Sequence, residues 1–84
     1  LEALARPVIH DALRDAGVQH RDLQAAFVGN GLGGLIQGQE TMLGQVLLAD
    51  AGIDSIPVHN IKNACSSGSD AVSLAWSAIA YGQY

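Results

Sequence analysis

The last predicted helix of the chain, over residues 64–84, constrains the fold most, because apolar side chains occupy nearly every side of it. The segment is rich in strong helix formers and contains no proline. Its apolar residues include Ala71, Val72, Leu74, Ala75, Trp76, Ala78, Ile79, Ala80 and Tyr81. A helix that is apolar all round is buried between layers. We therefore expect its cover to include a second half of the protein or a partner subunit.

Patterns ahead of this helix predict alternating helices and strands. Apolar residues recur at three- and four-residue steps over residues 1–16, and Gly17 can end that helix. Pro7 requires the helix either to begin near Arg6 or to kink there. Strands are predicted at 25–28 and 56–61, with a glycine-rich loop and a helix at 41–51 between them. This order is typical of a layered α/β protein with mainly parallel strands.

The composition excludes several classes of function. The chain has 4 basic and 8 acidic residues, so a surface that follows nucleic-acid phosphates or a polybasic membrane patch is not expected. No apolar run is long enough to span a membrane, and one cysteine excludes an internal disulfide. We expect a soluble protein of a reducing compartment, cytoplasmic, or peroxisomal if the source is eukaryotic.

The two ends of the chain are unusual for an α/β domain. The chain opens on Leu1 and stops at Tyr84, directly after a helix, where the next strand would follow. Its 84 residues suffice for one small domain. We therefore expect residues 1–84 to be a piece of a larger protein.

Cys65 falls where the second predicted strand turns into the last helix. Backbone N–H groups at the start of a helix lack intrahelical partners, and the helix dipole adds partial positive charge there. Both effects stabilise a thiolate and can hold the oxyanion of a thioester carbonyl. Ser66, Ser67 and Gly68 leave room for an acyl group. Cys65 is therefore a candidate nucleophile, and the alternative is a small buried apolar residue.

Polar residues near Cys65 have less specific roles. Asp70 lies in the first turn of the predicted helix, where capping is the favoured role and where its charge opposes a thiolate. Lys62 can add positive potential or extend into solvent, and solvent is favoured. The amides of Asn60 and Asn63 can order the loop.

The histidines do not form a site with Cys65 in the sequence. Extended residues at roughly 3.3 Å each put His59 about 20 Å away along the strand. His10 and His20 are expected to lie in solvent. His, Cys and acidic residues do not cluster at metal-ligand spacing, so no metal is predicted.

Gly29, Gly31 and Gly34 match the spacing of a dinucleotide-binding loop. In such a loop the helix starts inside the glycine run, and an acidic residue closes the next strand. Here Gln39 and Glu40 still precede the predicted helix. We therefore favour a close-packed or flexible loop, which can line a substrate channel, over nucleotide binding.

The cysteine lies in the run Asn63-Ala64-Cys65-Ser66-Ser67-Gly68-Ser69, which is followed by Ala71, Ala75, Ile79 and Gly82. This segment resembles the nucleophile segment of the thiolases, closest to the sterol-carrier-protein (lipid-transfer) type of acetyl-CoA acyltransferase. The resemblance extends upstream through Gly17, Gly29, Gly52 and Pro57, and covers nearly the whole chain. Ketoacyl synthases and hydroxymethylglutaryl-CoA synthases also place Ala-Cys-Ser at a helix start.

The resemblance implies a layered αβαβα fold of two similar halves, each a mixed sheet with helices. Residues 69–82 would form one of the two buried central helices. Residues 1–84 would be part of the N-terminal half, without its first strand and everything after the cysteine helix. This chain alone is then expected to be inactive.

The resemblance also implies acyl transfer between acyl-CoA thioesters through a covalent acyl group on Cys65. Coenzyme A thioesters would be substrates, with no separate cofactor, and the catalytic histidines and a second cysteine would lie elsewhere. A homodimer or oligomer would form through the strand from about Val58 to Lys62. The alternatives are a non-catalytic acyl-CoA- or lipid-binding homologue, a retro-aldolase-type homologue, or a ketoacyl synthase-like condensing enzyme.

Overall fold

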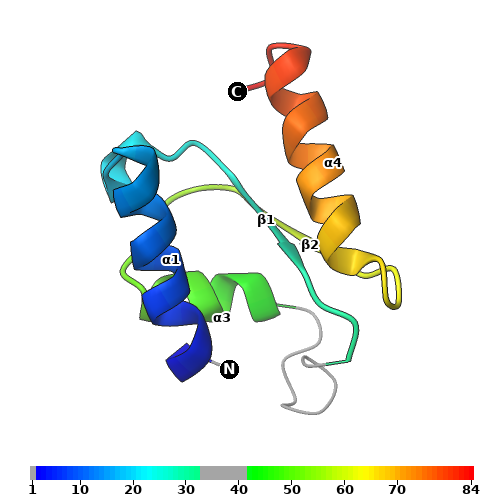
Figure 1. The fold of residues 1–84 in the computed structure, drawn as a ribbon, viewed down its shortest axis with the longest axis horizontal. Helices are drawn as coiled ribbons and strands as arrows, with labels where there is room; N and C mark the ends of the chain where they lie inside the picture. The colour runs from blue at the N-terminus through cyan, green and yellow to red at the C-terminus, as the bar shows by residue number, and fades with distance from the viewer. Residues whose placement is uncertain (1, 33–41) are drawn as a thin grey trace.

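A computed structural model describes residues 2–32 and 42–84. The elements in chain order are α1 (Glu2–Ala16), the short 3-10 helix η1 (His20–Asp22), β1 (Ala26–Gly29), α3 (Leu43–Asp50), β2 (Val58–Ile61) and α4 (Ser67–Ala80). Figure 1 shows this order along the ribbon. Expectations for Leu1, Gly34, Gln39, Glu40 and the first predicted residue of the second helix, Thr41, lie outside the described residues.

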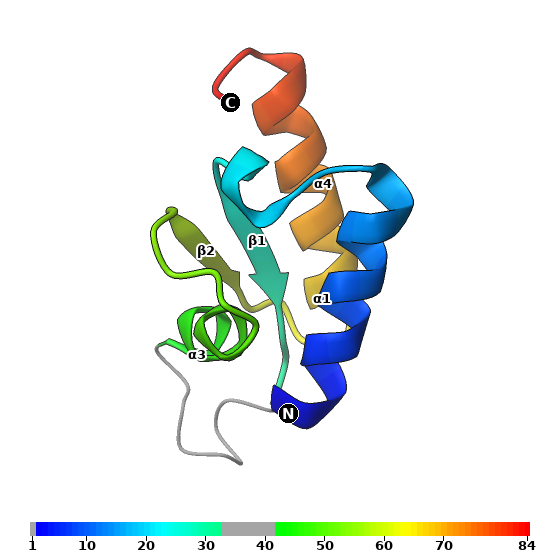
Figure 2. The same cartoon turned by 90° about the vertical axis from the view of Figure 1, so that its left-hand side faces the viewer.

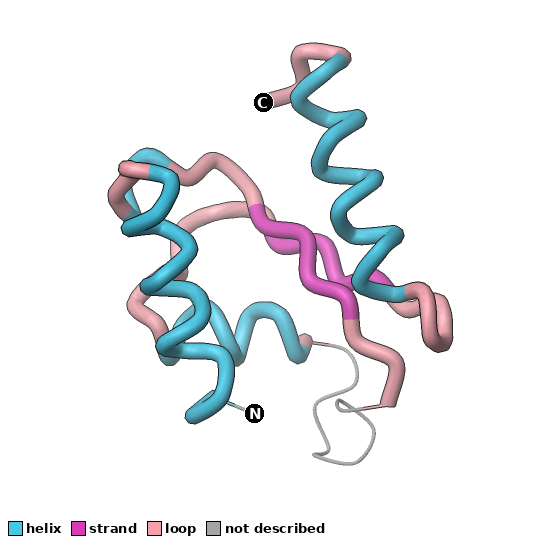
Figure 3. The backbone as a smooth tube through the Cα atoms, in the orientation of Figure 1, coloured by secondary structure: helices cyan, strands magenta, loops and turns pink. Residues whose placement is uncertain are grey.

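β1 and β2 form a two-stranded parallel sheet, in which Ala26 is opposite Val58 and Gly29 is opposite Ile61. The ladder extends beyond both strands, because the N–H of Ala26 donates to the carbonyl of Pro57 and that of Asn30 to the carbonyl of Ile61. The two strands run side by side in Figure 3. The predicted α/β class with parallel strands is confirmed.

The helices lie on both sides of this sheet. α4 packs along β1 on one side, while α3 contacts both strands from the other side and α1 packs against α3. Figures 1 and 2 show this layering from two directions. The buried apolar residues come from α3, the turn after it and α4: Leu43, Leu48, Ala51, Ile53, Ala71 and Ala78.

The helix ends follow from glycines. Gly17, Gly52 and Gly82 have φ values of +73°, +90° and +75°, each just past a helix. The next amide in each case donates back across the last turn, as in the 2.8 Å bond from Ile53 N–H to Leu48 C=O. This is the Schellman geometry, which favours glycine. The predicted ends at Gly17 and Gly52 are confirmed.

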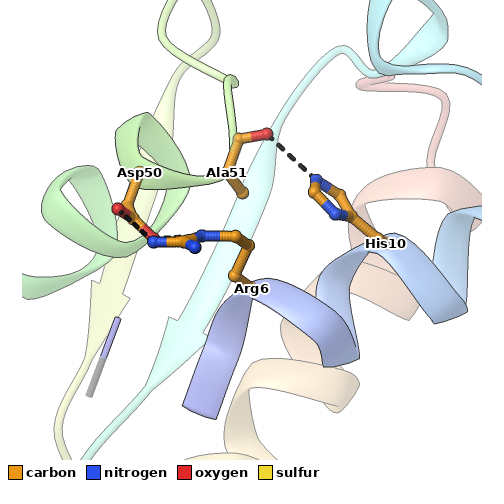
Figure 4. Close-up of polar contacts among 4 residues, drawn as sticks. All are labelled: Arg6, His10, Asp50 and Ala51. Atoms are coloured by element: carbon orange, nitrogen blue, oxygen red, sulfur yellow. Dashed lines mark hydrogen bonds and ion pairs between the residues drawn. The ribbon is translucent and has the colours of Figure 1, made fainter. Parts of the chain in front are cut away.

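The start of α1 differs from one expectation. The helix begins at Glu2 and runs through Pro7, so a start near Arg6 is wrong. The sequence pattern does not show the tertiary contacts that hold the first turns of this helix. Arg6 pairs in a bidentate way with Asp50 of α3, with both nitrogen–oxygen distances at 2.9 Å, and His10 Nε2 lies 3.2 Å from the carbonyl oxygen of Ala51 (Figure 4).

α4 is covered on one side only by the described residues. Ser67, Ala71 and Ala78 are buried. Val72, Trp76 and Ile79 are 71%, 69% and 69% exposed. The burial expected of a central helix is therefore seen on the face toward the sheet, and the opposite face has no cover among residues 2–32 and 42–84. None of the helices in the described ranges is long and apolar enough to cross a membrane.

β1 and α4 approach so closely that Gly29 cannot carry a side chain. A Cβ built at Gly29 would lie 2.3 Å from the carbonyl oxygen of Ser67 and 2.8 Å from the nitrogen of Gly68. Both atoms belong to the helix backbone, which cannot rotate away as a side chain can. The absence of a Cβ therefore sets the distance between the end of β1 and the first turn of α4.

Gly29→Ala in the intact protein is expected to lower the free energy of unfolding by about 1–3 kcal/mol, because it forces the start of α4 away from β1. Thermal or urea unfolding measures the change. Gly68→Ala is the matched control, since a Cβ there meets nothing within 4 Å. It should leave stability equal or higher by about 0.5–1 kcal/mol, because alanine is the better helix former. Equal losses from both variants would contradict the close approach.

Arg6→Ala is expected to destabilise the intact protein by up to about 1 kcal/mol, more than Arg14→Ala does. Arg6 joins α1 to α3 by two hydrogen bonds to Asp50. Among the described residues, Arg14 pairs with Asp11 of its own helix, and both side chains are more than two-thirds exposed. The comparison of the two unfolding curves at low and high salt tests this expectation. A loss for Arg14→Ala as large as that for Arg6→Ala, or no loss for Arg6→Ala, would contradict the expected contribution of the contact between helices.

Candidate active site

Cys65 lies in the turn between β2 and α4, as the sequence predicted. β2 ends at Ile61, Ser66 is the N-cap, and α4 begins at Ser67. Cys65 therefore sits one residue outside the helix cap rather than within the first turn. Its thiol is free and the residue is exposed, which disfavours the alternative of a buried apolar residue.

The backbone just before Cys65 is strained. Ala64 has a φ of +47°, the one non-glycine residue of the described ranges with a positive value. For a residue with a Cβ this left-handed conformation costs roughly 1–2 kcal/mol. Such strain is found where a functional constraint holds the chain. The turn therefore reverses the chain sharply at Ala64 and presents Cys65 at its outside.

Ser67 holds this turn from inside the protein. It is 3% exposed, and its hydroxyl both accepts and donates a hydrogen bond. Its Oγ accepts the N–H of Asn63 at 2.8 Å and donates to the carbonyl of Ala64 at 2.8 Å. The N–H and the hydroxyl of Ser66 both lie 3.0 Å from the carbonyl oxygen of Asn63. The first residues of α4 thus hold both sides of the strained residue.

Asp70 has a different role from the one expected. Its carboxylate Oδ2 accepts a hydrogen bond from the side-chain amide of Asn63, seven residues earlier. It does not act as the helix cap, because the cap residue is Ser66 and its side chain makes no capping bond. Helical geometry explains the difference: the turn brings Asn63 over the first turn of α4, where Asp70 lies. The expected ordering of the loop by the Asn63 amide is confirmed.

The other predicted loop amide reaches a different element. Asn60 Oδ1 accepts the N–H of Gly44 at 2.7 Å, and Asn60 Nδ2 donates to Gln45 Oε1 at 2.7 Å. An N–H in the first turn of α3 is thereby satisfied by a strand residue. Asn60 fastens α3 to β2 instead of ordering the loop around Cys65.

An apolar cavity of about 390 Å³ lies beside the cysteine. It is lined by Gly31, Leu32, Ala64 and Cys65. The cavity is open to solvent, since Leu32, Ala64 and Cys65 are all exposed. Gly31 lies close to the turn, since a Cβ there would be 3.1 Å from the carbonyl oxygen of Ala64. Gly31 and Leu32, the described residues of the glycine-rich loop nearest Cys65, therefore form one wall of this cavity.

Among the described residues, the histidines contact residues other than Cys65. His59 stacks on Phe27 with ring centroids 4.6 Å apart, and its Nε2 is 3.4 Å from the hydroxyl of Tyr84. His10 stacks on His20 at 5.4 Å and contacts the carbonyl of Ala51 just after α3, so His10 is half-buried rather than solvated, whereas His20 is exposed as predicted. The short helix η1, which begins at His20, had no signal in the apolar pattern. In the part of the chain that the structure describes, no three His, Cys, Asp or Glu residues gather as metal ligands.

Known proteins resemble most of this chain. The thiolase N-terminal domain family matches residues 1–84. An acetyl-CoA acetyltransferase of Methanothermobacter thermautotrophicus is 40% identical over 74 residues, which are 87% of this chain and 19% of that protein. The benzoylsuccinyl-CoA thiolase subunit BbsB of Thauera aromatica is 32% identical over 83 residues, 96% of this chain and 20% of that subunit.

A third relative carries a different name. The non-specific lipid-transfer protein-like 2 of Caenorhabditis elegans is 35% identical over 71 residues, 84% of this chain and 16% of that protein. The chain thus spans between 16% and 20% of the length of these three relatives. The family match over residues 1–84, together with the parallel α/β fold, shows that this chain belongs to the thiolase family through its N-terminal domain.

Proposed function

We propose that the protein containing this chain transfers acyl groups between coenzyme A thioesters through a covalent acyl group on Cys65. The observation that carries the proposal is the exposed cysteine on a strained turn, beside an apolar cavity, in a chain of the thiolase family. Two of the relatives are named for chemistry of this kind, an acetyl-CoA acetyltransferase and a benzoylsuccinyl-CoA thiolase subunit.

In the proposed reaction the sulfur of Cys65 bonds to the ketone carbon of a ketoacyl-CoA. The carbon–carbon bond on the thioester side of that ketone breaks, and its electron pair leaves with the departing acyl-CoA, which takes up a proton. The acyl group stays on sulfur as a thioester until the thiol of coenzyme A removes it. In the reverse direction a second acyl-CoA is condensed with the same acyl group.

Different residues of this chain take different parts in the proposed reaction. Cys65 is the nucleophile, and it lies one residue before the N-cap of α4. The cavity beside Leu32 and Ala64 receives the apolar part of the acyl group. We assign the proton transfers to residues outside residues 1–84, since His10 contacts Ala51 and His59 contacts Tyr84. Coenzyme A enters as substrate, and the proposal needs no separate cofactor or metal.

The second candidate is a non-catalytic protein that binds acyl-CoA or lipid in the same fold. The observation that favours it is the relative named as lipid-transfer-protein-like. In this case the apolar cavity binds an acyl chain while Cys65 forms no bond to it. Retro-aldol cleavage, which needs no acyl group on Cys65, and ketoacyl synthase-like condensation are the further alternatives.

Incubation of the intact protein with an acyl-CoA should add the mass of the acyl group to the peptide that contains Cys65. Mass spectrometry after proteolysis measures the adduct, which Cys65→Ala should abolish. Ser69→Ala, a neighbouring exposed hydroxyl, is the matched control and should keep the adduct.

Two outcomes of that experiment separate the candidates. Acyl-CoA binding that survives Cys65→Ala, with no adduct in the natural protein under turnover conditions, would reject acyl transfer and support the binding protein. An adduct that persists after Cys65→Ala would place the nucleophile elsewhere.

We also propose that the intact protein is a homodimer joined near Val58 and Lys62. β2 pairs with β1 on one edge, and among the described residues no strand pairs with its other edge. Such an edge pairs readily with a copy of itself. Light scattering over a dilution series should give twice the chain mass of the intact protein. A stable monomer at every concentration would reject the dimer.

A further inference from the structure

Asn63 is bound to the start of α4 through its backbone and its side chain. Its N–H donates to the hydroxyl of Ser67, its carbonyl accepts Ser66, and its side-chain amide donates to Asp70. The last of these bonds joins residues on opposite sides of the cysteine turn. It is also the only one of the three that uses no atom of the turn between residues 64 and 67.

We propose that the Asn63–Asp70 hydrogen bond positions Cys65 for acyl transfer. This proposal rests on the function proposed above. Ala64 must stay at a φ of +47° for the turn to present the sulfur, and a backbone in this region relaxes unless its neighbours hold it. Asn63 precedes Ala64, and Asp70 fixes the side chain of Asn63 against α4. The pair thereby prevents Ala64 from relaxing and keeps the sulfur beside the cavity.

The chemistry of Asp70 fits this role. Asp70 accepts the Asn63 amide as a charged acceptor, which makes a stronger bond than a neutral one. The positive end of α4 tolerates the carboxylate in the first turn. Asp70 is thus a positioning residue and not a catalytic one.

Four variants of the intact protein separate positioning from charge. Asn63→Ala removes the donor, Asp70→Ala removes the acceptor and the charge, and the double variant removes both partners. Asp70→Asn removes the charge and keeps an acceptor oxygen for the Asn63 amide. Asp54→Ala is the matched control, because this carboxylate bonds to Ser55 on an exposed loop.

The measurement is the rate of Cys65 acylation by an acyl-CoA in a single turnover, with its dependence on acyl-CoA concentration. Asn63→Ala and Asp70→Ala should each slow the maximal rate by about 10- to 100-fold, the effect of a misplaced reacting atom, with little change in half-saturation. The double variant should be no slower than either single variant, since both remove the same bond. Asp70→Asn should retain most of the rate.

The contrary results are distinct. Three results would each overturn positioning and leave acyl transfer intact. Asn63→Ala could be acylated at the natural rate, the rate losses of the single variants could multiply in the double variant, or Asp70→Asn could lose as much rate as Asp70→Ala. Absence of any adduct on Cys65 in the natural protein would overturn both proposals. Melting curves accompany each variant, and Asp70→Asn keeps the test decisive where an alanine variant does not fold.

Discussion

The contact between Gly29 and the first turn of α4 is the constraint on which the site depends. Because β1 ends in a glycine, the backbone of Ser67 comes within the distance a Cβ would occupy. That approach places Ser67 in the interior, where its hydroxyl must find both a donor and an acceptor. It finds them in Asn63 and Ala64. Burial of one hydroxyl therefore dictates the path of the chain on both sides of Cys65.

The sequence predicts well those features that neighbouring residues decide. Helix ends at Gly17 and Gly52 need only a residue that accepts positive φ, and the strands need short apolar runs between turn residues. The position of Cys65 between β2 and α4 follows from the same local signals. These elements match the structure because their main determinants lie within a few residues along the chain.

Features that depend on distant partners are not predictable in this way. α1 runs through Pro7 while Arg6 binds Asp50, 44 residues away. Asn60 reaches α3, although its place beside the cysteine loop suggested a local role. Asp70 is a residue type that often caps helices, and it lies in the first turn of α4. Only the fold of the turn shows that Asn63 is its partner. Each outcome depends on which side chains the tertiary structure brings together.

The exposed face of α4 connects the fold to the chemistry. Val72, Trp76 and Ile79 keep more than two-thirds of their surface in contact with water in this chain, which is unusual for large apolar residues on one helix. In a thiolase fold this helix is expected to meet a second layer. A layer over α4 would also exclude water near Cys65, where a lower dielectric strengthens the interaction of an oxyanion with the N–H groups of the helix. The same apolar side chains that demand cover would then make the positive end of α4 more effective in the proposed acyl transfer.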